Sequence, residues 1–187
     1  MVGWILLGVL GLALLWLVMV YNGLVAKRND VQGSWKQIDV QLNRRHDLIP
    51  NLVSTVKGAL EFEQDTLEKV ISARAKAVGA TGPQSKAEAE NMLTQALGKL
   101  FAVMENYPDL KSNQNVLQLQ EELTSTENRI AFARQLYNDL VANFRTALQV
   151  FPDNIVASMF NFKPEEYFEA PAEAKATPAV NLSLRGK

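Results

Sequence analysis

The sequence predicts an all-α protein in which an N-terminal transmembrane helix is followed by a helical bundle. The first 26 residues carry no charged side chain. In the rest of the chain, apolar residues recur in steps of three and four, as on one face of an α-helix. Glycine and proline occupy a few separated positions, which is typical of helices joined by discrete turns rather than of a sandwich or barrel.

The composition limits the classes of function. With 187 residues and 48% hydrophobic content, the chain can hold one compact domain with a real core. The net charge of −1 provides no basic excess to track a phosphate backbone, so nucleic acid is not an expected partner. The absence of cysteine excludes a disulfide framework, a thiolate nucleophile and a sulfur metal site.

Residues 1–26 are predicted to be a transmembrane anchor, which makes the lipid bilayer a partner. The stretch from Trp4 to Tyr21 is almost wholly Leu, Val, Ile, Gly and Trp. About 20 such residues, each rising about 1.5 Å, cross a hydrocarbon core of about 30 Å. A cleaved signal peptide would need a basic start and a small-residue cleavage site, and neither is seen. We therefore favour a retained anchor.

Positive charges after the span predict its orientation. Lys27, Arg28 and Lys36 follow the apolar stretch closely. Positively charged flanks stay on the cytoplasmic side. We expect a single-pass protein of the inner (plasma) membrane, with the N-terminus outside and the C-terminal domain in the cytoplasm.

The bundle is expected to comprise residues 27–151, and its first break is ambiguous. An apolar seam runs through Val31, Trp35, Ile38, Leu42, Ile49, Leu52 and Val56. A turn at Asp47–Pro50, with Asp47 as N-cap, would start a second helix at residues 48–78 and give four soluble helices. A single kinked helix is the alternative, because the seam stays in phase across Pro50. We favour the turn, which would return the C-terminal segment towards the bilayer.

Two further helices follow from the same periodicity. Glycine and proline in residues 79–85 predict a loop, with Ser85 as the N-cap of a helix that ends near Asn106. The longest apolar stripe then runs over residues 112–151.

Charged residues interrupt these seams and predict a polar network inside the bundle. Arg45 takes a place between Leu42 and Ile49 where an apolar side chain is expected. A charge on a buried face needs partners, and Glu127 and Arg134 interrupt the last stripe in the same way. We expect a structural network made of Asp39, Arg44, Arg45, Asp47, Glu127, Asn128, Arg134 and Asn138.

Residues 152–168 are predicted to form a short apolar C-terminal helix after Pro152. The candidate docking face consists of Ile155, Val156, Met159 and Phe160. This face could close an end of the bundle, dock a partner or enter the membrane. We favour closure, because the segment carries more carboxylates than lysines, which disfavours an anionic lipid surface. Residues 169–187 have the composition of a flexible tail.

No catalytic constellation is found. His46 is the single histidine, and Asn43 stands where a di-iron Glu-x-x-His motif needs its glutamate. No nucleophile elbow, phosphate loop or dinucleotide fingerprint occurs. His46 beside Asp47 could sense pH, but we interpret it as a surface histidine near a turn. We expect no catalytic, cofactor-binding or metal-binding residue, no cofactor and no enzymatic activity.

Several long motifs resemble the LemA family of bacterial membrane proteins. They are Tyr21-Asn-Gly-Leu-Val-Ala-Lys-Arg-Asn29, residues 35–53, Val56-Lys-Gly58, Glu105-Asn-Tyr-Pro-Asp-Leu110, residues 127–138 and Phe151-Pro-Asp-Asn-Ile155. The resemblance implies an N-terminal anchor and an antiparallel, up-and-down bundle, here of four helices, with no established enzymatic activity. His46 and Ala59 depart from the tyrosines common in the family.

The function predicted from these features is a non-catalytic, membrane-anchored helical scaffold. It would associate with itself as a homo-oligomer, or with another inner-membrane protein. The alternative is an adaptor or regulator of an inner-membrane protease or envelope-stress system, acting through residues 151–168.

Overall fold

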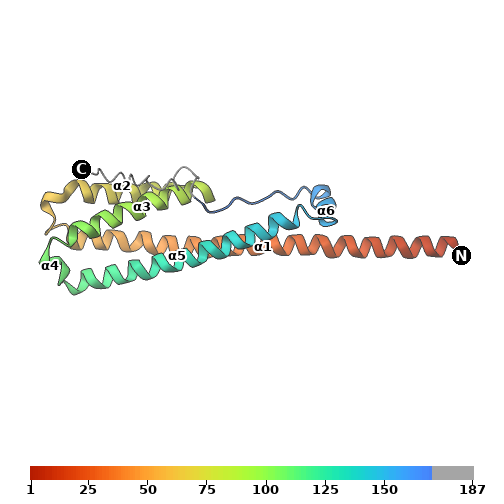
Figure 1. Ribbon diagram of the computed structural model, residues 1–187, viewed down its shortest axis with the longest axis horizontal. Helices are drawn as coiled ribbons and strands as arrows, with labels where there is room; N and C mark the ends of the chain where they lie inside the picture. The colour runs from red at the N-terminus through yellow and green to blue at the C-terminus, as the bar shows by residue number, and fades with distance from the viewer. Residues whose placement is uncertain (170–187) are drawn as a thin grey trace, which may run out of the picture.

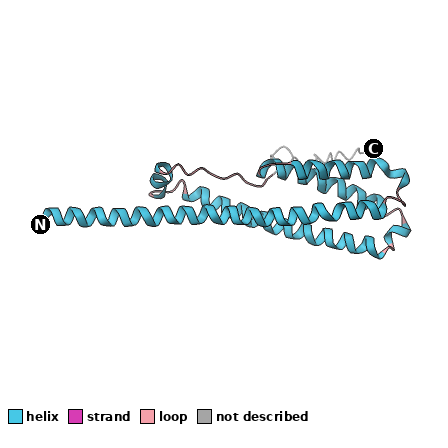
Figure 2. Ribbon diagram, turned by 180° about the vertical axis from the view of Figure 1, so that it is seen from behind, coloured by secondary structure: helices cyan, strands magenta, loops and turns pink. Residues whose placement is uncertain are grey.

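The computed structural model describes residues 1–169, so the expected flexible tail lies outside the described residues except for Glu169. Within the described range every regular element is a helix. An elongated helical domain follows a long apolar N-terminal helix (Figures 1 and 2). The prediction of an all-α fold with this division is confirmed.

Helix α1 (Val2–Val56) joins the apolar segment to the domain without a break. Its 55 residues correspond to a length of about 80 Å. Every residue from 1 to 15 is exposed, and in Figure 1 this part projects alone beyond the other helices. The second half of α1 packs into the domain. The apolar segment and the domain therefore share one continuous helix.

The turn favoured at Asp47–Pro50 is wrong, because α1 continues through Pro50. Ile49, Leu52 and Val56 are all fully buried, so burial of the in-phase seam stabilises the helix beyond the proline. Pro50 itself is exposed. The chain reverses later, at residues 57–63, where the 3₁₀ turn η1 (Glu61–Glu63) precedes the next helix.

The remaining helices run back and forth beside α1. They are α2 (Gln64–Gly79), α3 (Pro83–Met104), the single turn α4 (Pro108–Lys111), α5 (Gln114–Ala147) and α6 (Asp153–Met159). Figure 1 shows α2 and α3 as one antiparallel pair and α1 and α5 as another. The expected turn at Pro50 would have returned the chain towards the apolar end of α1. The reversal at residues 57–63 has this effect instead.

Local chemistry sets several of these boundaries. Gly82 has a φ of 82°, a left-handed conformation that suits glycine, and Pro83 follows as the first residue of α3. The N-cap of α5 is Asn113, whose side chain accepts hydrogen bonds from the backbone N–H groups of Asn115 and Val116.

Apolar contacts hold the domain together in three clusters. At the end farthest from the anchor, α1, α2, α3 and α5 share a cluster that includes Leu52, Val70 and Leu93. In the middle, α1 and α5 pack around Tyr137 and Phe144. Next to the anchor, α6 packs on α1. The core therefore extends along the whole domain as a narrow rod.

After α6 the chain runs back along the domain as an extended segment, residues 161–168, which we call the strap (Figure 1). The Tyr137 hydroxyl donates to the Glu166 carbonyl at 2.7 Å. Phe168 is 2% exposed, with its ring 5.7 Å from that of Trp35. The expected C-terminal helix thus covers only the first part of residues 152–168, and side-chain contacts on α1 and α5 hold the remainder extended.

Candidate functional site

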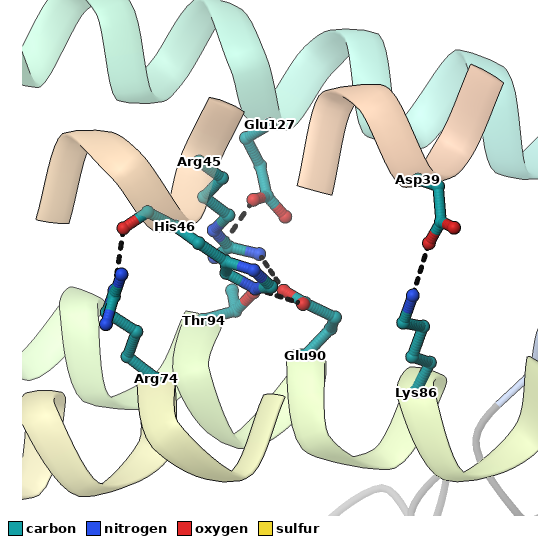
Figure 3. A network of polar contacts seen from close by, with 8 residues as sticks. All are labelled: Asp39, Arg45, His46, Arg74, Lys86, Glu90, Thr94 and Glu127. Atoms are coloured by element: carbon teal, nitrogen blue, oxygen red, sulfur yellow. Dashed lines mark hydrogen bonds and ion pairs between the residues drawn. The ribbon is translucent and has the colours of Figure 1, made fainter. Parts of the chain in front are cut away.

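Arg45 is the centre of a polar network between three helices. It lies on α1 and is 3% exposed. Its guanidinium donates to Glu90 of α3 at 3.2 Å and to Thr94 of α3 at 2.7 Å, and pairs with Glu127 of α5 at 3.0 Å (Figure 3). The planar fork of arginine suits such multiple recognition. One side chain therefore ties both helix pairs together.

His46 lies beside Arg45 in the same network. Its Nε2 is 2.7 Å from Oε1 of Glu90, and both residues are buried. The interpretation of His46 as a surface histidine is wrong, because the uninterrupted helix α1 presents it to α3 instead of placing it at a turn. Glu90 uses one carboxylate oxygen for His46 and the other for Arg45.

Arg74 of α2 completes the hydrogen bonding of α1 at the proline. In an α-helix the carbonyl of His46 would accept from the N–H of residue 50, but Pro50 has no N–H. Arg74 Nε donates to this carbonyl at 2.7 Å (Figure 3). A neighbouring helix thus satisfies the carbonyl that the proline leaves without a helical donor.

A separate ion pair joins α1 and α3 towards the anchor. Lys86 contacts Asp39, and its ammonium group lies 5.6 Å from the centre of the Trp35 ring. Both charged groups are partly exposed. Asp39 therefore pairs apart from Arg45, although both were expected in one network.

The remaining predicted network residues lie elsewhere. Arg44, Asp47, Asn128 and Arg134 are exposed, and Asn138 binds the backbone of Phe168 in the strap. Arg134 stands four positions after the buried Ile130, yet it is exposed, whereas Val141, one heptad later, is fully buried.

Sequence reasoning missed Glu90, Thr94, Arg74 and Lys86. Glu90 had a usable signal, since it stands three and seven residues before Leu93 and Leu97, on the buried face of α3. A carboxylate in that phase is as informative as Arg45 in the seam of α1. Arg74 had no comparable signal.

A small cavity of about 220 Å³ lies beside the network. Leu97, Phe101 and Leu123 are among its apolar lining residues, and Arg45 and Glu127 are among its polar ones. These two charged groups are paired with each other at 3.0 Å. No group of three or more His, Cys, Asp or Glu residues that could hold a metal occurs within residues 1–169. The contacts of the network join α1 to α3 and α5.

The outer surface offers a larger feature between α1 and α5. A shallow groove of about 500 Å³, called the α1–α5 groove, is lined by Lys36, Gln37, Val40, Gln41, Arg129, Phe132, Ala133 and Leu136. Phe132 is 73% exposed and Val40 is 61% exposed. Large apolar side chains grouped on a surface in this way are typical of interaction sites.

The candidate docking face on α6 divides in two. Val156 is fully buried in a cluster with Leu24 of α1 and Ala147 of α5. Ile155, Met159 and Phe160 are exposed. The Phe160 ring lies 4.7 Å from that of Tyr21, at the end of the apolar part of α1.

Comparison with known proteins identifies relatives along nearly the whole chain. The sequence profile described as the LemA family matches residues 34–182. Magnetosome protein MamQ 2 of Paramagnetospirillum magneticum is 28% identical over 90% of this chain and 71% of its own length. Magnetosome protein MamQ of Magnetospirillum gryphiswaldense is 28% identical over 83% and 67%. Protein LemA of Metamycoplasma hominis is 27% identical over 80% and 68%.

Proposed function

The chain belongs to the LemA family, and from this premise we propose that it is a non-catalytic scaffold that associates with copies of itself at the inner membrane. The continuity of α1 carries this proposal. A helix without a break from the apolar segment to Val56 transmits the orientation of the anchor to the domain. The domain then stands on the cytoplasmic side as a rod and does not move freely on a linker.

A shared orientation makes side-by-side association favourable. Copies inserted in the same direction are parallel, so a twofold axis along the membrane normal brings the same surface of each copy together. The α1–α5 groove runs along the side of the rod and exposes Val40, Phe132 and Leu136. Burial of these side chains against a second copy would provide an apolar contact of the kind that isologous interfaces use.

Charge around the groove is compatible with this arrangement. Lys36 and Arg129 line the groove, and Asp139 is exposed one turn beyond Leu136. Trp35 packs against Tyr137, with ring centres 5.3 Å apart, so Lys36 and Asp139 lie at similar heights along the rod. In a parallel pair, each copy can present its carboxylate at the level of the other's ammonium group.

Disulfide crosslinking in membranes tests the proposal, because the chain has no cysteine of its own. Phe132→Cys should form a disulfide-linked dimer on mild oxidation. The matched control is Phe62→Cys, since Phe62 is 94% exposed but lies at the far end of the rod. Only the variant at position 132 should crosslink.

Two outcomes contradict self-association through this groove. One is equal, low crosslinking at positions 132 and 62. The other is a crosslink from position 132 to a different membrane protein. A protease subunit recovered in this way would support the adaptor function instead.

A further inference from the structure

Exposed apolar side chains of α6 lie beside the uncharged part of α1. Ile155 is 52% exposed, Met159 58% and Phe160 45%, and the nearby Phe151 is 80% exposed. Grouped exposure of this kind indicates a partner surface. The partner can be inferred from the position of α6 relative to the anchor.

Contacts with α1 fix the level of α6. Val156 and Ala157 form a buried cluster with Leu24, and Trp16 and Val20 pack against it. The first charged residue of α1 is Lys27, so all these contacts lie on its membrane side. Trp16 is about 16 Å before Lys27 along the helix axis, at about 1.5 Å per residue. α6 therefore lies at the depth where the apolar span meets the headgroups.

The residues around α6 are those that favour a membrane interface. The rings of Phe160 and Phe162 lie 4.7 Å and 5.8 Å from the Tyr21 ring. Tryptophan and tyrosine side chains are enriched at this level of a bilayer, and Trp16 and Tyr21 both pack against the α6 cluster. Arg28 lies 5.3 Å from the centre of the Phe162 ring, which places a cation on the side of this aromatic group that faces the domain.

The carboxylates that argued against a lipid surface lie mostly elsewhere. Glu166 belongs to the strap, and its carbonyl accepts from Tyr137 of α5. Glu165 is its neighbour in the strap. Asp153, in the first turn of α6, is the carboxylate that remains at the level of the apolar face. The negative charge of the segment is therefore concentrated away from the bilayer.

We propose that α6 is an interfacial foot, whose side chains Ile155, Met159 and Phe160 insert between the lipids of the leaflet from which α1 emerges. The foot and α1 form two apolar contacts with one bilayer, joined through Val156 and Leu24. This arrangement fixes the rotation and tilt of the rod about the anchor. It rests on the anchor of the proposed function but not on self-association.

Spin labels can measure the depth of α6 in the full chain. Single cysteines at positions 155 and 159 are labelled in phosphatidylcholine–phosphatidylglycerol vesicles, and collision rates with oxygen and with a water-soluble nickel chelate are compared. Leu10→Cys provides the lipid reference, because Leu10 is 60% exposed within the apolar span. Phe62→Cys provides the aqueous reference.

At positions 155 and 159, oxygen collisions should exceed nickel collisions several-fold, as at position 10, whereas nickel collisions should dominate at position 62. If nickel collision rates at positions 155 and 159 equal those at position 62, while position 10 shows a lipid environment, the foot is overturned and the anchor remains supported. Low access to both reagents would mean that protein covers α6, which also overturns it. An aqueous signal at position 10 would contradict the anchor itself.

Discussion

Arg74 of α2 donates to the backbone carbonyl of His46, the carbonyl that Pro50 leaves without a helical N–H. The donor comes from 28 residues away along the chain. It satisfies the carbonyl that the proline leaves without a donor, while burial of Ile49, Leu52 and Val56 stabilises α1 beyond Pro50. A helix interrupted at Asp47–Pro50 would have ended before Leu52 and Val56, so the part of α1 that packs into the far cluster lies beyond this contact.

The first prediction is that Arg74 and Pro50 are energetically coupled. Arg74→Met should lower the free energy of unfolding by about 1–3 kcal/mol, because a largely buried carbonyl loses its donor. In a Pro50→Ala background the alanine N–H can donate to His46, so the effect of Arg74→Met should shrink to a few tenths of a kcal/mol. Urea unfolding of the four proteins measures the coupling.

Lys76→Met provides the control for this cycle, because Lys76 lies on the same helix and is exposed. It should change stability little in either background. An effect of Arg74→Met that is equally large with alanine at position 50 would show that Arg74 acts through some other contact.

The second prediction concerns the buried ion pairs of Arg45. Arg45→Met should lower the free energy of unfolding by about 3–5 kcal/mol, because Glu90 loses its guanidinium partner while remaining buried. The adjacent Arg44→Met removes the same charge from an exposed site and should cost less than about 0.5 kcal/mol. Equal melting midpoints for the two variants would contradict the structural role of Arg45.

The third prediction is a loss of stability at alkaline pH through Tyr137. Burial, with the nearby carboxylates of Glu165 and Glu166, raises the pKa of this phenol from 10.0 to about 12. Since the unfolded chain releases the proton at lower pH than the folded one, stability is retained below pH 10 and falls as pH rises towards 12. Phenolate absorbance measured against pH should show one tyrosine that ionises later than the others in the wild type, and this step should be missing in Tyr137→Phe.

Tyr137→Phe also removes the hydrogen bond to the Glu166 carbonyl. It should loosen the strap and lower stability at neutral pH by about 1 kcal/mol. As pH rises from 10 towards 12, the free energy of unfolding should fall less in this variant than in the wild type, and this difference is the quantity to measure. An unchanged pH dependence would mean that Tyr137 does not control it.

The fourth prediction is that the domain lies in the cytoplasm. A cysteine at position 62 should react with a membrane-impermeant thiol reagent only after cells are permeabilised. The positive charges of Lys27, Arg28 and Lys36 give the physical reason. A cysteine replacing Val2, at the opposite end of α1, is the matched control and should react in intact cells. The reverse pattern would invert the proposed topology.

Much of this architecture was predictable because the signals are local. A run of uncharged residues is long enough for a bilayer whatever follows it, and a seam with a period of three and four requires a helix with a buried face. The motifs similar to the LemA family are local in the same sense. Arg45 also followed from its own position, because a charge within an apolar seam has to find partners.

The partners of Arg45 could not be identified from residues near it in the chain. Glu127 was expected and lies 3.0 Å from Arg45, but Glu90 and Thr94 come from a helix whose rotation no single-helix pattern specifies. The same phase argument that placed Arg45 inside placed Arg134 in a stripe from which the packing of α5 excludes it. Periodicity identifies which face is buried, whereas the depth of a residue at its edge depends on the neighbouring helix.

The amino-acid sequence by itself determined the apolar N-terminal helix, the helical class, the family and the presence of a buried charge, since each depends on residues close together in the chain. Only the tertiary structure decided that α1 continues through Pro50 and that α6 returns to the base of the anchor. Both outcomes depend on contacts between distant segments, Arg74 with His46 and Val156 with Leu24. Packing supplies the hydrogen-bond donor and the apolar surface that local preferences lack.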